Sequence, residues 1–176
     1  MHHKVLIIDD NIRFLEQGVQ LLKGIADGAY THVAPPLYGN GIGGHFRHCL
    51  DHYVNLLDGL DARVVDYDSR ARELKIETNR VYAISCIQQL ILRLKALPED
   101  APERSLSCKM DCGSEDTLRM SGSSVRRELQ FLISHTVHHY ALIAMMLRYQ
   151  GIEPHPEFGV APSTLRYRES QLKCAQ

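Results

Sequence analysis

Apolar residues recur at intervals of three and four positions along four long stretches of the chain. That spacing places them on one face of an α-helix, so each stretch is expected to form an amphipathic helix. The pattern is clearest in the last stretch, where Leu132, His139 and Ile143 share one stripe and Gly151 follows as a stop signal. The predicted helices cover residues 9–26, 42–60, 78–97 and 123–150.

The segments between these helices are rich in turn-forming or charged residues. Two prolines and three glycines mark residues 27–41 as a loop, and the charges of residues 61–76 indicate a surface connection. The short, polar, glycine-containing segment 104–121 fits a small hairpin. Three prolines indicate that residues 152–176 form an extended tail packed over the helices. The predicted fold is all-α: a single domain, residues 1–176, built as an antiparallel four-helix bundle.

The overall composition excludes some classes of function. Lysine and arginine number 20 against 21 acidic residues, and this balance argues against a nucleic-acid partner. No apolar run reaches the roughly 18 residues that cross a bilayer, so no membrane segment is expected. The apolar run Val5–Ile8 is too short for a signal peptide. We therefore predict a cytoplasmic protein.

Two histidines of the last predicted helix are candidate metal ligands. His135 and His139 lie four residues apart, so their side chains leave the same helix face one turn from each other. Such a pair can chelate zinc, nickel or iron. Interior histidines that only form hydrogen bonds explain the pair equally well, because a buried imidazole needs a partner of one kind or the other.

The second predicted helix offers three candidates for a further ligand: His45, His48 and His52. On a helical wheel, His45 and His52 lie nearer the apolar face than His48 does. His48 and His52 are themselves four residues apart. The periodicity of the sequence therefore does not choose among them.

Two short motifs resemble those of the DinB-like superfamily, which includes the YfiT-type bacillithiol transferases. They are the stretch 41–48, Gly-Ile-Gly-Gly-His-Phe-Arg-His, and the stretch 134–139, Ser-His-Thr-Val-His-His. The resemblance implies a homodimeric four-helix bundle whose metal ligands are His48, His135 and His139. His52 and His45 remain the alternatives that the sequence itself leaves open. The resemblance also implies a divalent ion, zinc or nickel first and iron or manganese otherwise. Tyr140-Ala141-Leu142 stands where many members have Arg-Gly-Gln, which indicates a distinct branch.

Three neutral imidazoles leave coordination positions open for water or substrate, as in catalytic metal sites. We therefore expect a metal-dependent enzyme that acts on a small molecule. The resemblance implies a thiol transferase that uses a low-molecular-weight thiol, or a hydrolase. The competing hypothesis is a bundle that binds a metal or ligand without catalysis.

Other residues near the motifs have both a functional and an ordinary interpretation. Glu128 lies two turns before His135 and could orient a ligand or accept a proton, although acids also suit the first turns of a helix. Arg70, Arg72 and Tyr67 could bind an acidic substrate, or could belong to a solvated loop. Cys49 follows His48 and is expected to be a core thiol.

Overall fold

The computed structural model describes residues 6–35, 39–111, 113 and 120–174, and the fold of this part is mostly helical. In chain order the elements are α1 Leu6–Gly24, α2 Asp27–Thr31, α3 Ile42–Gly59, β1 Val64–Asp66, α4 Leu74–Thr78, α5 Arg80–Lys95, the 3-10 helix η1 Ala101–Glu103, β2 Ser105–Lys109, β3 Met120–Ser124, α6 Val125–Tyr149 and α7 Pro162–Cys174.

The long helices α1, α3, α5 and α6 occupy the four stretches in which the apolar spacing predicts helices. Side chains cap two of them, because Asn79 accepts a hydrogen bond from the backbone of Tyr82 in α5 and Ser124 does the same for Arg127 in α6. After α6, Gly151 adopts a positive φ of 75°, a conformation that glycine reaches without strain.

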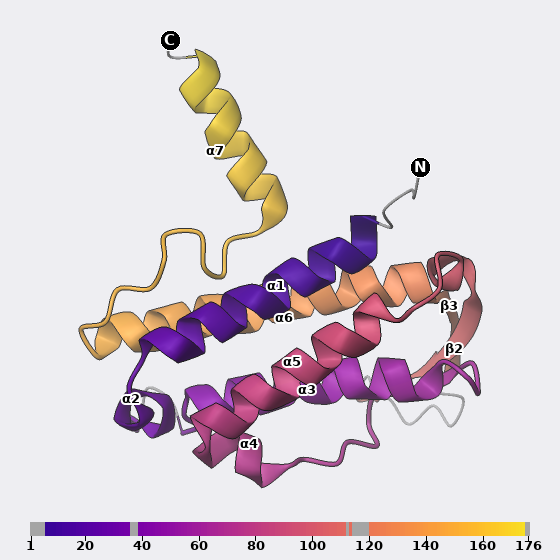
Figure 1. Cartoon of the computed structure of the whole chain (residues 1–176), viewed down its shortest axis with the longest axis horizontal. Coiled ribbons are helices and arrows are strands. Elements are labelled where there is room, and N and C mark those ends of the chain that lie inside the picture. The colour runs from indigo at the N-terminus through magenta and orange to yellow at the C-terminus, as the bar shows by residue number, and fades with distance from the viewer. Residues whose placement is uncertain (1–5, 36–38, 112, 114–119, 175–176) are drawn as a thin grey trace.

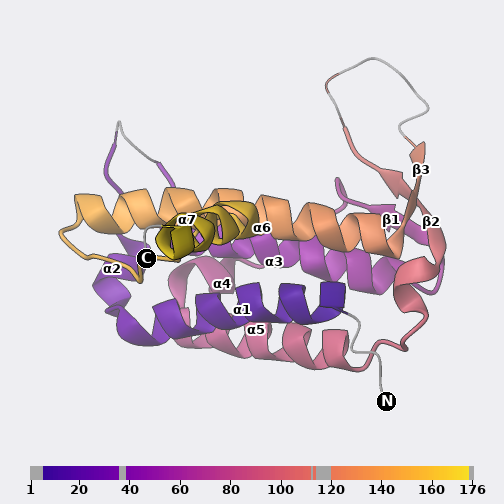
Figure 2. The ribbon, with the colours of Figure 1, turned by 90° about the horizontal axis from the view of Figure 1, so that it is seen from above.

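These four helices lie side by side (Figures 1 and 2), and their apolar faces form the core. α1 packs against α5 and α6, and α3 packs against the same two helices. As the colours in Figure 1 show, α1 and α6 run in one direction, and α3 and α5 in the other. α2 and α4 lie at one end of the four packed helices, and the strands lie at the other end. The contact between α3 and α6 brings the two histidine motifs together.

A small three-stranded sheet corrects the all-α prediction. β2 and β3 form an antiparallel hairpin, as the polar segment after the third helix predicts, although β3 extends beyond residue 121. β1 adds a parallel strand that pairs Val65 with Cys108. The sequence did not reveal β1, because three residues are too few to show an alternating pattern.

Both connections predicted to be irregular contain ordered elements that contribute to the core. The loop at 27–41 begins with α2, whose Tyr30 is fully buried and donates its hydroxyl hydrogen to the carbonyl of Ile76. The surface connection at 61–76 contains β1 and the start of α4, and its Tyr67 is 2% exposed. Helices of five residues make too few turns for periodicity to reveal them.

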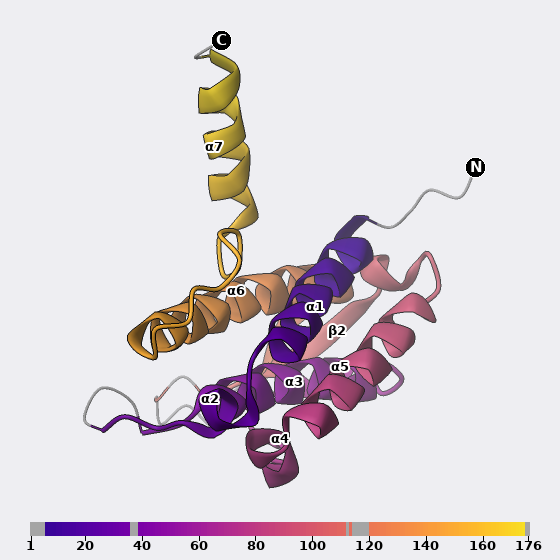
Figure 3. The ribbon, with the colours of Figure 1, turned by 60° about the vertical axis from the view of Figure 1, so that its left-hand side comes forward.

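The C-terminal segment is only partly the extended tail that its prolines predict. Its first part crosses α6. There the Phe158 ring stacks on the Tyr140 ring, with the two ring centroids 4.5 Å apart. The second part is α7, which projects away from the other helices (Figure 3). Pro162 begins this helix, since the fixed φ of proline suits the first helical position. Among the helices in the described part of the chain, none combines the length and apolarity needed to span a membrane.

Candidate metal centre

Five histidines meet where α3 faces α6. His45, His48 and His52 project from successive turns of α3, and His135 and His139 project from successive turns of α6. Adjacent rings of the cluster lie close together; the centroids of His48 and His135 are 4.8 Å apart, and those of His52 and His135 4.2 Å. The helix contact thus gathers all the histidines that the two motifs contain except His138, which is exposed.

The Nε2 atoms of His48 and His139 each approach Nε2 of His135 as two ligands of one metal do. His135 Nε2 lies 3.1 Å from His48 Nε2 and 3.2 Å from His139 Nε2. Two nitrogen ligands at about 2.0–2.1 Å from a tetrahedral ion are about 3.3 Å apart. His135 therefore lies at ligand spacing from His48 and from His139, while the three histidines whose ligand atoms all lie within 4.8 Å of one another, among the described residues, are His48, His52 and His135.

The ligand atoms of His52 and Cys49 also lie close to His135. One ligand atom each from His48, His52 and His135 lies within 4.8 Å of the others, and the same holds for Cys49, His135 and His139. Burial raises the pKa of the Cys49 thiol, which disfavours the thiolate that metals bind. His52 is thus the stronger alternative, and its ring centroid lies 4.2 Å from that of His135, compared with 4.8 Å for His48 and 4.6 Å for His139.

Hydrogen bonds orient the rings of the cluster. His139 Nδ1 lies 2.9 Å from Nδ1 of His45, so one of these atoms donates and the other accepts. His52 Nδ1 lies 2.8 Å from the carbonyl oxygen of His48 and must donate to it, which leaves its Nε2 lone pair free. Contacts of this kind hold the rings of metal-binding histidines in place.

The histidines are neutral at physiological pH. Burial, followed by the neighbouring imidazoles, lowers the pKa of His135 to about 2, that of His48 to about 3 and that of His139 to about 4. Burial also lowers the pKa values of His45 and His52. A neutral imidazole carries the lone pair that a metal requires.

Aromatic rings form one wall of the cluster. Tyr67 stacks on His52 with its centroid at 5.4 Å, and Phe131 stacks on His135 at 5.5 Å. His52 is 6% exposed as a result. These rings keep water from one side of the cluster, and a charge there is screened less than in solvent.

The candidate Glu128 has partners other than histidine. It is 3% exposed, and its carboxylate accepts hydrogen bonds from Tyr67 at 2.9 Å and from Ser123 at 2.5 Å. These contacts join β3 and the residue that follows β1 to the first turn of α6. Its position in the structure favours a role in holding the small sheet against the helix.

Arg70 comes closer to the histidines than its place in a charged segment suggests. Its Nη1 lies 3.0 Å from His48 Nδ1, and the side chain is partly buried. Of the two other residues considered with it, Arg72 is exposed and Tyr67 is buried against Glu128. Sequence reasoning could not separate Arg70 from Arg72, because a loop has no periodic face.

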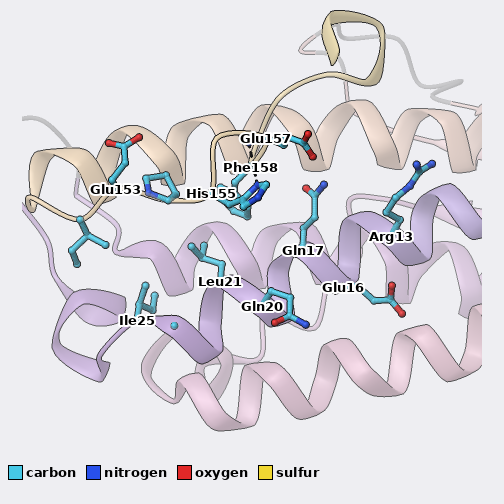
Figure 4. Close-up of a pocket in the computed structure, with 13 residues that line it drawn as sticks. Arg13, Glu16, Gln17, Gln20, Leu21, Ile25, Glu153, His155, Glu157 and Phe158 are labelled. Atoms are coloured by element: carbon cyan, nitrogen blue, oxygen red, sulfur yellow. Dashed lines mark hydrogen bonds between the residues drawn. The ribbon is translucent and has the colours of Figure 1, made fainter. Parts of the chain in front are cut away.

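A pocket of about 630 Å³ lies elsewhere, between α1 and the segment that follows α6 (Figure 4). Leu21, Ile25 and Phe158 contribute apolar surface, and charged residues such as Glu16 and Glu157 line it as well. None of the five clustered histidines lines this pocket.

The comparison with solved structures supports the fold, and the two comparisons by sequence do not bear on it. No protein-family model matches the chain. A curated protein of Rhizopus delemar named FK506-binding protein 5 is 33% identical over 111 residues, or 61% of this chain. The chain spans only 28% of the length of that relative. A crystal structure of YjoA, a DinB-like protein of Bacillus subtilis, is similar with a TM-score of 0.62, over 87% of this chain and 95% of that one, at 16% identity.

The chain has a DinB-like fold. This agrees with the resemblance that the two histidine motifs carry. In the DinB-like fold of this chain, the motifs lie on α3 and α6 and face each other across the helix contact.

Proposed function

We propose that the protein is a divalent-metal-dependent enzyme of the DinB-like superfamily that acts on a small molecule, as a thiol transferase or a hydrolase. The observation that carries the proposal is the approach of His48 Nε2 and His139 Nε2 to His135 Nε2, at 3.1 and 3.2 Å. The neutral state of these imidazoles and the DinB-like fold support it.

In this proposal His48, His135 and His139 hold the ion, with His52 as the alternative ligand. A bound divalent ion of this kind acts as a Lewis acid that favours the anionic form of a thiol or of water. His45 keeps His139 in position through the contact between their Nδ1 atoms. The rings of Tyr67 and Phe131 exclude water from one side.

The finer assignments are part of the same proposal. We assign zinc or nickel as the native ion, and a low-molecular-weight thiol as the partner in the transferase reaction. We also assign an antiparallel four-helix bundle, made by α1, α3, α5 and α6, as the scaffold. A homodimer is the assembly that the family resemblance favours.

One observation favours the competing hypothesis of a binding protein without catalysis. Among the described residues, no carboxylate forms a hydrogen bond with a histidine of the cluster. Glu128 is bonded to Tyr67 and Ser123, and Asp51 is paired with Arg47 at 3.0 Å. A general base within reach of a reacting group is thus supplied by the histidines, by the substrate, or not at all.

Metal content tests the centre directly. Protein purified without nickel and reconstituted with zinc should contain one ion per chain by elemental analysis. His135→Ala should lower zinc affinity by more than the about 10–100-fold that loss of a ligand's hydrogen-bond partner costs. His138→Ala is the matched control, because His138 is the exposed neighbour on the same helix. Equal zinc binding by both variants would refute the metal centre.

Turnover separates the enzyme from the binding protein. The zinc-loaded protein should transfer a small thiol to a halogenated arene, and His135→Ala should abolish the reaction. A zinc-loaded protein without turnover in this assay and in ester or amide hydrolysis would favour the binding protein. Turnover that survives His135→Ala would mean that the reaction does not use this centre.

A further inference from the structure

We propose that Arg70 is a specificity-determining residue that binds a carboxylate of the substrate or thiol while the other end of that molecule occupies the histidine cluster. The inference rests on the proposed metal centre and adds the charge of the molecule that the centre accepts.

The loop that carries Arg70 is held in a defined shape. Asn55 on α3 donates through Nδ2 to the carbonyl oxygens of Asp66 and Ser69, at 2.6 and 3.3 Å. The carboxylate of Asp66 accepts hydrogen bonds from the backbone of Asp68 and Ser69, at 3.0 and 3.2 Å. Arg70 therefore approaches the cluster from a fixed backbone, so little conformational entropy is lost when it binds a ligand.

The guanidinium of Arg70 has unused hydrogen-bonding capacity. Its Nε is buried and has no hydrogen-bond partner, and Arg70 forms no ion pair with an Asp or Glu in the described part of the chain. A donor that is buried without an acceptor destabilises the fold, so a ligand that supplies an acceptor is favoured. The other arginine close by, Arg47, is already paired with Asp51 and Glu77. Arg70 is thus the cation at the cluster that retains capacity for an anion.

A metal at the cluster would free a second donor of Arg70. Arginine only donates, so His48 Nδ1 must accept from Arg70, and the proton of neutral His48 then lies on Nε2. Coordination through Nε2 moves that proton to Nδ1. Nδ1–H cannot accept from Arg70, so the guanidinium must release His48 when the ion binds. Nη1 would then be available beside Nη2, and the N–H groups of these two end nitrogens point the same way.

Two neighbouring donors of one guanidinium match the two oxygens of a carboxylate. The single positive charge of Arg70 balances the single negative charge of a carboxylate. Only the ring of His48 separates Arg70 from the Nε2 atoms of the cluster. A short molecule with a metal-binding group at one end and a carboxylate at the other can therefore span both.

Ligand binding to the cobalt-loaded protein tests this assignment without an activity assay. Thiolate coordination to cobalt(II) produces a charge-transfer absorption, which can be titrated with 3-mercaptopropionate, an anion, and with 2-mercaptoethanol, a neutral thiol of similar length. The dissociation constants of the two thiols give one ratio for each protein. Comparing the ratio of a variant with that of the wild type cancels the intrinsic difference between the thiols. The variants are Arg70→Gln, Arg70→Lys and, as a matched control in the same loop, the exposed Arg72→Gln.

We expect Arg70→Gln to reduce the preference for 3-mercaptopropionate by at least about tenfold. A tenfold change in affinity corresponds to about 1.4 kcal/mol, which is what a hydrogen bond between charged groups contributes. Arg70→Lys should retain part of the preference, and Arg72→Gln should retain all of it. A preference ratio that changes less than about twofold in Arg70→Gln, with cobalt still bound, would overturn the role of Arg70 and leave the metal centre intact. Absence of cobalt absorption in the wild-type protein would overturn both.

Discussion

The buried hydrogen bond between Tyr67 and Glu128 gives a sharp test of how the structure assigns roles around the cluster. The Tyr67 hydroxyl donates to Glu128 Oε2 at 2.9 Å, and the two side chains are 2% and 3% exposed. Burial and the nearby carboxylate raise the pKa of Tyr67 far above its usual value, so the hydroxyl keeps its proton at neutral pH. The bond joins the residue that follows β1 to α6, and its loss should weaken the fold.

The substitution Tyr67→Phe removes the donor and leaves the ring. A hydrogen bond to a charged group contributes about 1.5–3 kcal/mol, and Ser123 and Arg127 remain as partners of the carboxylate. We therefore expect Tyr67→Phe to lower the free energy of unfolding by about 2 kcal/mol. Because the phenyl ring can still stack on His52, zinc affinity should stay within about twofold of the wild-type value.

Urea unfolding of the metal-free protein, followed by circular dichroism, measures the change. Tyr67→Phe, Glu128→Gln and the double variant form a cycle, in which residues in direct contact should show a coupling energy of about 1–2 kcal/mol. Tyr167→Phe is the control, since the Tyr167 side chain is 64% exposed on α7 and its hydroxyl should contribute little.

Two results would refute this reasoning. A coupling energy near zero would mean that the bond between Tyr67 and Glu128 does not contribute to stability. A Glu128→Gln variant with unchanged stability but zinc affinity lowered more than about tenfold would return Glu128 to the role of a residue that orients a metal ligand.

Two further predictions concern the packing of α3 and the charge of the cluster. Gly43→Ala should destabilise the protein by about 3 kcal/mol or more. The added Cβ would clash with the backbone of Glu77, because it would lie only 2.7 Å from the Glu77 carbonyl carbon. Gly24→Ala, at a position where a Cβ meets nothing within 4 Å, should be neutral or stabilising by up to about 1 kcal/mol in the same urea assay. The metal-free protein should lose stability as pH falls below about 6.5, since the unfolded chain then binds protons at His48, His135 and His139, while their pKa values of about 3, 2 and 4 keep them neutral in the folded state. Three such groups lower the free energy of unfolding by up to about 4 kcal/mol per pH unit, and by about half of that after allowance for their partial exposure to solvent. Urea unfolding at pH 7 and at pH 5 measures this change, and equal free energies of unfolding at the two pH values would contradict the prediction.

Local properties of the sequence were sufficient for the long helices. Periodic apolar residues, the cap at Ser124 and the stop at Gly151 depend on neighbours within a few positions, and the structure has α6 between them. The proximity of His135 and His139 also follows from helix geometry alone, because residues four apart on a helix are neighbours. The short elements α2, α4 and β1 lacked this signal, and Pro162 indicated a tail where it begins α7.

The composition of the candidate site depended on tertiary structure. Periodicity placed His45, His48 and His52 on one helix without choosing among them, and the packing of α3 on α6 decides which nitrogen atoms meet His135. The same packing, together with β1, carries Tyr67 to Glu128 and Arg70 to His48. The relative position of two helices results from the fit of many side chains over their whole contact. The spacing of residues within one helix therefore determined the histidine pair, and only the packing between helices determined what surrounds it.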